Sequence, residues 1–413
     1  MEASTKSLPD SGECEQAKTT EDLCLSGTHI PANVRRYFEM GAGRGQTVRE
    51  NELAFQRWRF LPRVLRSVSQ RRLETSLLGQ SVSMPVCIAP TALHKLVNAE
   101  GELATAKDDE SASDEDVVVM CDSSSEEDSD DVFTNSDSEA EESSDDTMAS
   151  AREWYRIDSD SIPARPPRFE LKGSPGVTIT VYLYKNRSIT RYQVERAEQL
   201  GFGAIVLTAD SPVIGSVETE AADWEARGIR CPNFDEWGME AARPAFWDAG
   251  ATWKCLEWLR SVTALPIVVK GILRRDDALL AAEHGAAAIL VSNHGGRQLD
   301  GTITTLEALR EVSAAVRGMP VEVYVDGGVR EAADVAKVLA LGAKAAFIGR
   351  PVVWALAQKG EDGVANLLEN FRKDLDRILA LLGCPSVDDI DSSFVRCHDS
   401  SSGSLEQQSV QEA

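Results

Sequence analysis

Short apolar runs recur along the chain from Pro85 onward, and amphipathic stretches lie between them. The runs span residues 85–89, 177–184, 204–209, 266–271, 287–293, 321–328 and 345–350. Apolar runs without polar alternation are typical of parallel strands that are covered on both faces. The stretches at 190–201, 274–285, 305–318 and 331–342 have helical periodicity and end in glycine, which often terminates helices. This alternation predicts an α/β protein with an eight-stranded barrel, of which seven strands are visible.

The eighth strand has to lie between residues 92 and 177, where the sequence is dominated by acidic residues. Residues 108–146 contain 18 Asp and Glu and no Lys or Arg. A single apolar interruption, "VVVMC" at 117–121, is a candidate for the second strand, but its charged flanks leave disorder equally open. We expect a solvated, flexible excursion over about 123–167, because so many like charges cannot be packed together.

Composition divides the 413 residues into a globular part and two tails. Residues 1–30 and 393–413 are rich in Ser, Glu and Gln, so we expect disordered tails, with one barrel domain over 31–392 and the acidic insertion at about 108–167 within it. Of the formal net charge of −24, the run 108–146 carries −18, which leaves −6 for the other residues. The acidity is therefore local, and it argues against nucleic-acid binding.

Cysteine usage and hydropathy limit the cellular setting. The eight cysteines form no C-x-x-C pair and no regular spacing, which favours a reducing compartment and suggests no metal site. The N-terminus resembles no signal peptide, and no apolar run reaches the roughly 18 residues that span a membrane. We therefore predict an intracellular protein without membrane contact.

Polar and glycine residues follow the predicted strands at their carboxyl ends, where barrels of this type form their active sites. They are Thr91, Tyr182, Thr208, Asp210, Lys270, Ser292, His294, Arg297, Asp326, Gly327, Gly328, Gly349 and Arg350. The paired glycines of "VDGGVR" (325–330) and the arginines Arg330 and Arg350 suit a phosphate group, because glycine backbone N–H groups approach it closely and guanidinium groups bind it in forked hydrogen bonds. Tight turns with exposed arginines are the alternative for either motif alone.

His294 and Arg297 are the candidates for substrate chemistry. A histidine has a pKa near neutrality and suits proton abstraction, and an arginine beside it would orient a carboxylate. Asp210, at another strand end, could orient the imidazole. Lys270 ends an apolar strand and could stabilise negative charge on a bound cofactor. A structural histidine and a solvent-facing lysine are the alternatives.

These motifs resemble the FMN-dependent 2-hydroxy acid oxidases and dehydrogenases, the family of glycolate oxidase and L-lactate oxidase. The resemblance is carried by "SNHGGRQLDG", "PIVVKG", "VDGGVR" and "FIGRP", and it extends through 35–65 and 79–107 to roughly three quarters of the chain. It implies a TIM (β/α)8 barrel that holds FMN non-covalently. It also implies oxidation of (S)-2-hydroxy acids to 2-oxo acids, with hydrogen peroxide when oxygen is the acceptor, and it leaves open whether the C2 hydrogen leaves as a proton or as a hydride.

The resemblance also implies a role for each matching residue. His294 would be the catalytic base with Asp210 as its partner, and the substrate-binding residues would be Tyr37, Tyr182 and Arg297. The residues that would contact FMN are Pro90, Thr91, Ala92, Thr208, Lys270, Ser292, Asp326, Gly327, Gly328, Val329, Arg330, Gly349 and Arg350. The family further implies a homo-oligomer, a tetramer, that acts on small 2-hydroxy acids.

The chain departs from the family pattern at several positions. Val217 stands where the family usually has a second carboxylate-binding arginine, a loss of about 2 to 3 kcal/mol in substrate binding that Arg227 or Arg230 could offset. Thr180 occupies the position of a glutamine that contacts the flavin in the family, and Cys121 is only a possible equivalent of a serine that does so. The last residues, Gln411-Glu412-Ala413, differ from the peroxisomal Ser-Lys-Leu type of signal, which favours the cytoplasm over the peroxisome.

Three functions are therefore compared. The first is an FMN-dependent 2-hydroxy acid oxidase. The second is a catalytically weakened flavin-binding or interaction protein whose acidic loop recruits a partner or is phosphorylated, since acidic residues follow the serines Ser111, Ser113, Ser123, Ser124 and Ser125. The third, another phosphate-binding barrel such as an FMN-dependent isomerase, leaves His294 and Arg297 without a role.

Overall fold

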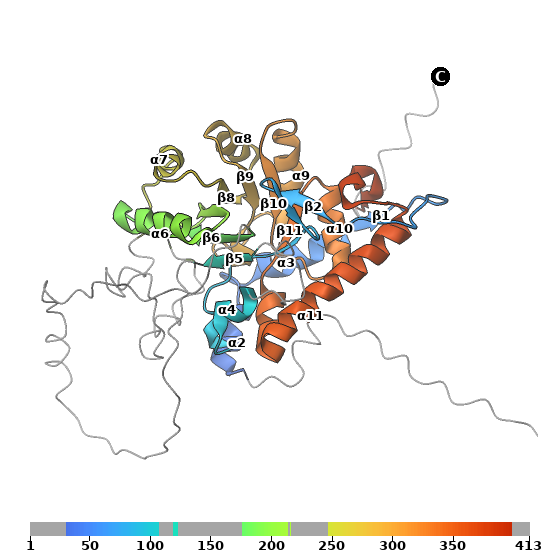
Figure 1. Cartoon of the computed structure of the whole chain (residues 1–413), viewed down its shortest axis with the longest axis horizontal. Helices are drawn as coiled ribbons and strands as arrows, with labels where there is room; N and C mark the ends of the chain where they lie inside the picture. The colour runs from blue at the N-terminus through green and yellow to red at the C-terminus, as the bar shows by residue number, and fades with distance from the viewer. Residues whose placement is uncertain (1–29, 107–118, 123–175, 214, 216–246, 399–413) are drawn as a thin grey trace, which may run out of the picture.

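A closed barrel of eight parallel strands forms the centre of the molecule (Figure 1). The computed structural model describes residues 30–106, 119–122, 176–213, 215 and 247–398. In spatial order the strands are β10, β11, β4, β5, β6, β7, β8 and β9. Their bounds are β4 Val86–Ile88, β5 Val119–Asp122, β6 Val177–Val181, β7 Ala204–Thr208, β8 Ile267–Ile272, β9 Ala288–Val291, β10 Glu322–Val325 and β11 Ala345–Ile348. The predicted barrel is confirmed.

The second strand lies in the apolar interruption of the acidic run. Strand β5 overlaps the predicted segment 117–121 and pairs with β6 from Val119↔Val177 to Asp122↔Thr180, and with β4 at Ile88↔Val119. The strand interpretation of this segment is therefore confirmed. Backbone pairing with β4 and β6 places this segment in the barrel, which the charged sequence around it did not indicate. Residues 107–118 and 123–175, where we expected the excursion, lie outside the described residues.

Helices cover the outside of the barrel (Figure 1). They are α4 Gly101–Ala106, α6 Arg187–Leu200, α7 Lys254–Val262, α8 Arg275–Glu283, α9 Thr305–Ala315, α10 Ala332–Ala340 and α11 Arg350–Leu382. In α6 the Asn186 side chain accepts a hydrogen bond from the Ser188 N–H at the start, and Gly201 adopts a left-handed conformation (φ 84°) at the end. Helix α11 is interrupted at Lys359 and Gly360, whose backbone angles are not helical.

Side-chain alternation along the strands builds two apolar layers. Val206, Val268 and Leu290 belong to one buried cluster together with Tyr324 and Phe347, whereas the residues next to them in sequence pack in a second cluster with the helices. Successive strand side chains point to opposite faces, so the first cluster fills the barrel and the second joins barrel to helices. The continuous apolar runs are thus explained by burial on both faces.

Segments before and after the barrel close its ends. Helices α2 (Ala32–Glu39) and α3 (Gln46–Gln56) and strand β1 (Trp58–Phe60) precede the barrel, followed by the hairpin of β2 (Thr75–Leu77) and β3 (Gln80–Val82). Short 3-10 helices are η1 (His94–Leu96), η7 (His294–Gly296), η8 (Val387–Asp389) and η9 (Ser392–Phe394). The Leu78 N–H donates to Glu322 at the start of β10 over 3.0 Å, so the hairpin packs at the amino-terminal end of the barrel.

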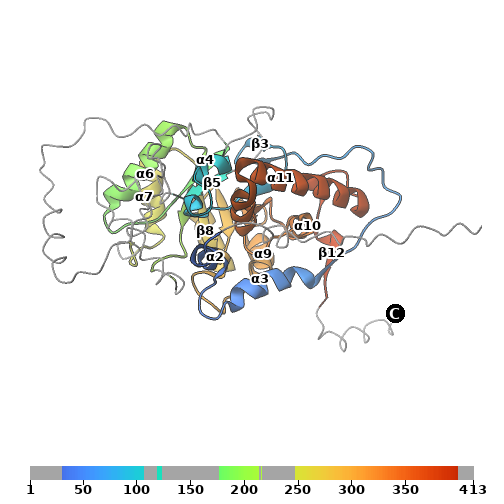
Figure 2. The same ribbon diagram turned by 90° about the horizontal axis from the view of Figure 1, so that it is seen from below.

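The predicted start of the C-terminal tail at 393 is wrong. Strand β12 (Val395–Cys397) pairs antiparallel with β1, in the register Trp58↔Cys397 to Phe60↔Val395, and Phe394 and Val395 are buried. In Figure 2, α3 runs toward β12. The order comes from pairing with a strand more than 300 residues earlier, which local composition cannot reveal. Residues 1–29 and 399–413, the rest of the predicted tails, lie outside the described residues.

Within the described part of the chain, Cys87 and Cys384 are buried, and Cys255 and Cys397 are half-buried. No helix there is both long and apolar enough to span a bilayer. The same residues contain no group of three or more His, Cys, Asp or Glu side chains placed to hold a metal ion.

Candidate active site

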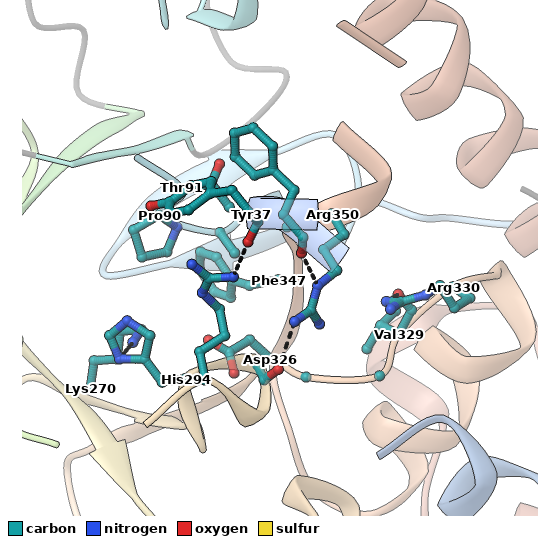
Figure 3. Close-up of a pocket in the computed structure, with 17 residues that line it drawn as sticks. Tyr37, Pro90, Thr91, Lys270, His294, Asp326, Val329, Arg330, Phe347 and Arg350 are labelled. Atoms are coloured by element: carbon teal, nitrogen blue, oxygen red, sulfur yellow. Dashed lines mark hydrogen bonds between the residues drawn. The ribbon is translucent and has the colours of Figure 1, made fainter. Parts of the chain in front are cut away.

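An open cavity of about 720 Å³ lies at the carboxyl ends of the strands (Figure 3). Its wall is built by α2 and by the residues that end or follow β4, β8, β9, β10 and β11. The predicted site residues that line it are Tyr37, Pro90, Thr91, Lys270, His294, Arg297, Asp326, Gly327, Gly328, Val329, Arg330, Gly349 and Arg350. The cavity is open to solvent, and its lining combines glycines, aromatic rings and charged side chains.

His294 is held by contacts on both its backbone and its ring. Its N–H donates to Ser292 Oγ over 3.0 Å, and Ser292 Oγ donates to Asp326 Oδ2 over 2.9 Å. The ring Nδ1 lies 3.1 Å from Asp210 Oδ1. A carboxylate only accepts hydrogen bonds, so this shorter contact is a hydrogen bond when Nδ1 carries the proton. The Lys270 ammonium at 3.3 Å from Nδ1, which is also a donor, is then a neighbouring charge and not a hydrogen-bond partner. This tautomer leaves the lone pair on Nε2, which is the form that can accept a proton.

Lys270 and Asp210 form the charged surroundings of the imidazole. The Lys270 ammonium is 3.3 Å from His294 Nδ1 and 4.0 Å from Asp210 Oδ2, and its side chain is 4% exposed. Burial favours the neutral form of Asp210, but electrostatic attraction to Lys270 and His294 and hydrogen bonds from His294 and Ser211 outweigh it and lower its pKa to about 2. Asp210 is therefore ionised at neutral pH and keeps His294 in one orientation.

A glycine makes this approach possible. Gly271, which follows Lys270 in β8, has φ 106°, and a Cβ there would lie 2.6 Å from the Asp210 Cβ. Any other residue at this position would push Asp210 away from the imidazole.

Three arginines bring positive charge to the cavity. Arg297 donates to the carbonyl oxygens of Tyr37 (2.7 Å) and Met40 (3.2 Å), and Arg350 donates to those of Phe38 (2.8 Å) and Gly295 (3.0 Å). Arg330 forms an ion pair with Glu52 at 2.5 Å. Burial first, and then the charges of Arg297 and Arg330, lower the pKa of Arg350 to about 9. An anion between these groups would relieve their mutual repulsion.

The floor of the cavity offers polar atoms suited to a hydroxylated phosphate ligand. Gly327 and Gly328 have φ 87° and 85°, a left-handed backbone that exposes N–H groups. Within the described residues, Asp326 Oδ1 and the hydroxyls of Thr180 and Thr208 are buried without a hydrogen-bond partner. Each unmade bond would cost about 1 to 3 kcal/mol. The unpaired Asp326 carboxylate oxygen, the glycine pair and the arginines fit the ribityl chain and phosphate of FMN, whereas Thr180 and Thr208 lie outside the cavity lining.

Not every expected residue reaches the cavity. Asp210 and Ser292 support His294 from behind, as described above. Thr208 is buried beside Lys270 in the sheet, at the register pair Thr208↔Lys270, and Ala92 is half-buried next to Thr91 outside the lining.

The position of Tyr182 reflects a contact that the sequence did not reveal. Its ring stacks on Trp247 with a centroid separation of 4.5 Å and an interplanar angle of 6°, and it is absent from the lining. Cys121 lies in β5, whereas Val217, Arg227 and Arg230 lie outside the described residues.

Sequence reasoning missed several residues at the site. Phe38, Ala89, Gly295 and Phe347 also line the cavity. His94, which is buried, lies behind the wall, with its Nε2 bonded to Thr91 Oγ1 and its Nδ1 2.9 Å from Thr105 Oγ1. A histidine three residues after Thr91 in "PTALH" was the available signal.

Comparison with known proteins gives a consistent result. The family model of FMN-dependent dehydrogenase matches residues 27–148 and 170–397. The human protein named 2-Hydroxyacid oxidase 1 is 37% identical over 383 residues, covering 89% of this chain and 93% of the relative. An L-lactate oxidase of Nostoc sp. is 38% identical over 385 residues, covering 90% and 95%.

Solved structures of two flavin enzymes also match this chain in fold. Mandelate oxidase with (S)-4-hydroxymandelic acid matches with a TM-score of 0.70 and 31% identity, covering 90% of this chain and 96% of that chain. A flavocytochrome b2 variant with pyruvate bound matches with a TM-score of 0.68 and 29% identity, covering 89% and 83%.

Proposed function

Because the chain belongs to the FMN-dependent dehydrogenase family, we propose that it oxidises (S)-2-hydroxy acids to 2-oxo acids. The observation that carries the proposal is the contact between His294 Nδ1 and Asp210 Oδ1 at 3.1 Å, in a cavity that also contains Arg297. A base with a fixed tautomer beside a guanidinium group suits a substrate that has both a hydroxyl and a carboxylate.

FMN is the cofactor of the family, and the cavity has groups for each part of it. The phosphate would be held by the N–H groups of Gly327 and Gly328 with Arg330 and Arg350, and the ribityl hydroxyls would donate to Asp326. The ring would lie near Pro90, Thr91 and Lys270. Bound FMN supplies the acceptor for the two electrons that leave the substrate.

The substrate carboxylate would bind to Arg297 and to the hydroxyl of Tyr37, both of which line the cavity. His294 accepts a proton from the substrate at Nε2. Ionised Asp210 stabilises the imidazolium that forms, and Lys270 stabilises negative charge that develops on the flavin side of the cavity.

Oxygen is the proposed final electron acceptor, which would yield hydrogen peroxide. The tetramer and the cytoplasmic location stay predictions from the sequence. The relatives reported above carry names of active oxidases, which supports the oxidase over the weakened flavin-binding alternative.

A spectrum of the purified protein tests the proposal. We expect a yellow protein whose visible flavin absorption bleaches anaerobically with glycolate, lactate or a longer 2-hydroxy acid and returns when oxygen is admitted. Failure of every acid in this panel to bleach a flavin-loaded protein would overturn the oxidase proposal. The R-enantiomers of lactate and of the longer acids serve as the matched control for the proposed stereochemistry.

A further inference from the structure

Two buried carboxamides join helix α3 to the loop that carries His294. Asn51 Nδ2 donates to Asn293 Oδ1 over 2.9 Å, and Asn293 Nδ2 donates to Asn51 Oδ1 over 2.8 Å. The two residues are 2% and 5% exposed and 242 positions apart in sequence. A carboxamide combines one acceptor with a two-hydrogen donor, so the reciprocal pair fixes the rotation of both side chains.

Asn293 uses its remaining hydrogen-bonding capacity on the loop itself. Its Oδ1 also accepts from the Gly296 N–H at 3.2 Å, and its Nδ2 also donates to the Ile303 carbonyl at 3.3 Å. The first bond caps the turn formed by residues 294–296 and the second ties it to the start of α9. Flipping the Asn293 amide would break both bonds.

The loop needs such support because its backbone is strained. His294, Gly295 and Gly296 have φ values of 58°, 60° and 74°, three consecutive left-handed residues of which one bears a side chain. A non-glycine residue in this region costs on the order of 1 kcal/mol or more and persists only where its surroundings determine it. Helix α3 and its N-terminal side supply further bonds, since the Ala42 N–H donates to the Gly296 carbonyl and the Gly301 N–H to Thr47 Oγ1.

Asn51 also lies against the opposite wall of the cavity. Its Oδ1 accepts from the Thr305 N–H at 3.4 Å, and Thr305 Oγ1 donates to the Gly327 carbonyl at 3.0 Å. A Cβ placed on Gly328 would lie 2.4 Å from the Asn51 carbonyl oxygen. Asn51 thus contacts both Asn293 in the His294 loop and Thr305, which in turn bonds the glycine pair Gly327–Gly328.

We propose that Asn51 is a positioning residue for the reaction, acting through Asn293 to hold His294 and Arg297 in register with the cofactor site. The expected loss of kcat/KM rests on the proposed function, whereas the expected change in the order of the His294 loop does not. Asn51 does not line the cavity and takes no part in proton transfer.

Two variants test this role, N51A and N51D. The first removes the amide, and the second keeps its shape and acceptors but loses the donor to Asn293 Oδ1. We expect both to lower kcat/KM at least about tenfold, since small misplacements of catalytic groups have effects of this size. The dissociation constant of FMN should stay within about threefold of the wild-type value, because the backbone of α3 against Gly328 is retained.

Hydrogen exchange over residues 293–301 measures the positioning directly. Exchange in this loop should accelerate in N51A and N51D, while exchange in the strands is unchanged. N366A is the matched control, because Asn366 is an exposed asparagine of α11 whose side chain bonds only within its own helix in the described contacts. It should behave as the wild type in every measurement.

A double-mutant cycle with N293A tests the route. If Asn51 acts through Asn293, N51A should lower kcat/KM of the N293A protein by less than about twofold. Additive losses, loop exchange equal to that of N366A, or a loss of activity matched by an equal loss of FMN affinity would each overturn the proposal. A wild-type protein that fails to bleach refutes the oxidase function instead, and loop exchange then decides the role of Asn51.

Discussion

Asp210 Oδ1 lies 3.1 Å from His294 Nδ1, so the carboxylate that follows β7 contacts the imidazole that follows β9. The contact leaves the unprotonated imidazole nitrogen available to a substrate. It also makes the ionisation of one carboxylate a condition for the function of the base.

The variant D210N should lower kcat by at least about 100-fold, because an amide can donate to Nδ1 and so stabilise the wrong tautomer. Steady-state turnover of a 2-hydroxy acid measures the effect. The control D276N removes an exposed carboxylate of α8 and should leave kcat unchanged. Wild-type turnover in D210N would show that Asp210 does not hold the base.

The acid stability of the protein should contain a contribution from Asp210. Its pKa is lowered from 3.8 to about 2 in the folded state, so ionised Asp210 stabilises the fold above pH 4. This stabilisation, on the order of 2 kcal/mol, is lost as the pH falls through 2. The free energy of unfolding in urea, measured for the wild type and for D210N between pH 5 and pH 2, should converge toward the acid end. A constant difference would contradict the assignment.

Replacing Arg297 should weaken the binding of substrate rather than of flavin. Loss of a charge-assisted contact of about 2 kcal/mol predicts 2-oxo acid binding weaker by roughly 30-fold in R297A. Perturbation of the flavin absorption by pyruvate gives the dissociation constant. R275A, which changes an exposed arginine of α8, is the control. Equal pyruvate affinity in R297A and R275A would exclude Arg297 as the carboxylate-binding residue.

Alanine substitutions at Gly328 and Gly318 separate two causes of destabilisation, the steric clash of an added Cβ and the strain of a left-handed backbone. The φ values of the two glycines are 85° and 84°. A Cβ on Gly328 would lie 2.4 Å from the Asn51 carbonyl oxygen, whereas a Cβ on Gly318 would have no neighbouring atom within 4 Å. G318A should cost about 1 kcal/mol and G328A at least about 2 kcal/mol more. Thermal unfolding compares the two, and only G328A should weaken FMN binding. Equal destabilisation would mean that the glycine loop moves freely away from α3.

The sequence predicted the barrel strands closely because burial on both faces leaves an uninterrupted apolar signal, as at 204–209 and 287–293. The second strand was ambiguous because its apolar run is short and charged residues interrupt it on both sides. Strand β5 has four residues and an acidic sequence on both sides of it, and its pairing with β4 and β6, more than its own composition, accounts for its conformation.

The site was predictable where single residues follow a strand, as His294 and Arg350 do. It was not predictable where contacts span the chain. Nothing near Asn51 indicates that its partner is Asn293, and the stacking of Tyr182 on Trp247 joins residues 65 positions apart. Side chains that support the cavity from behind leave no periodic pattern in the sequence.

The pairing of β1 with β12 has a consequence for the biosynthesis of the molecule. Helix α3 ends at Gln56, two residues before β1, and the partner of β1 is Val395–Cys397. During translation β1 therefore lacks its partner strand until residues 395–397 have been synthesised. Strand β1 directly follows the helix that supports the His294 loop, so the far end of this segment is paired only late in synthesis.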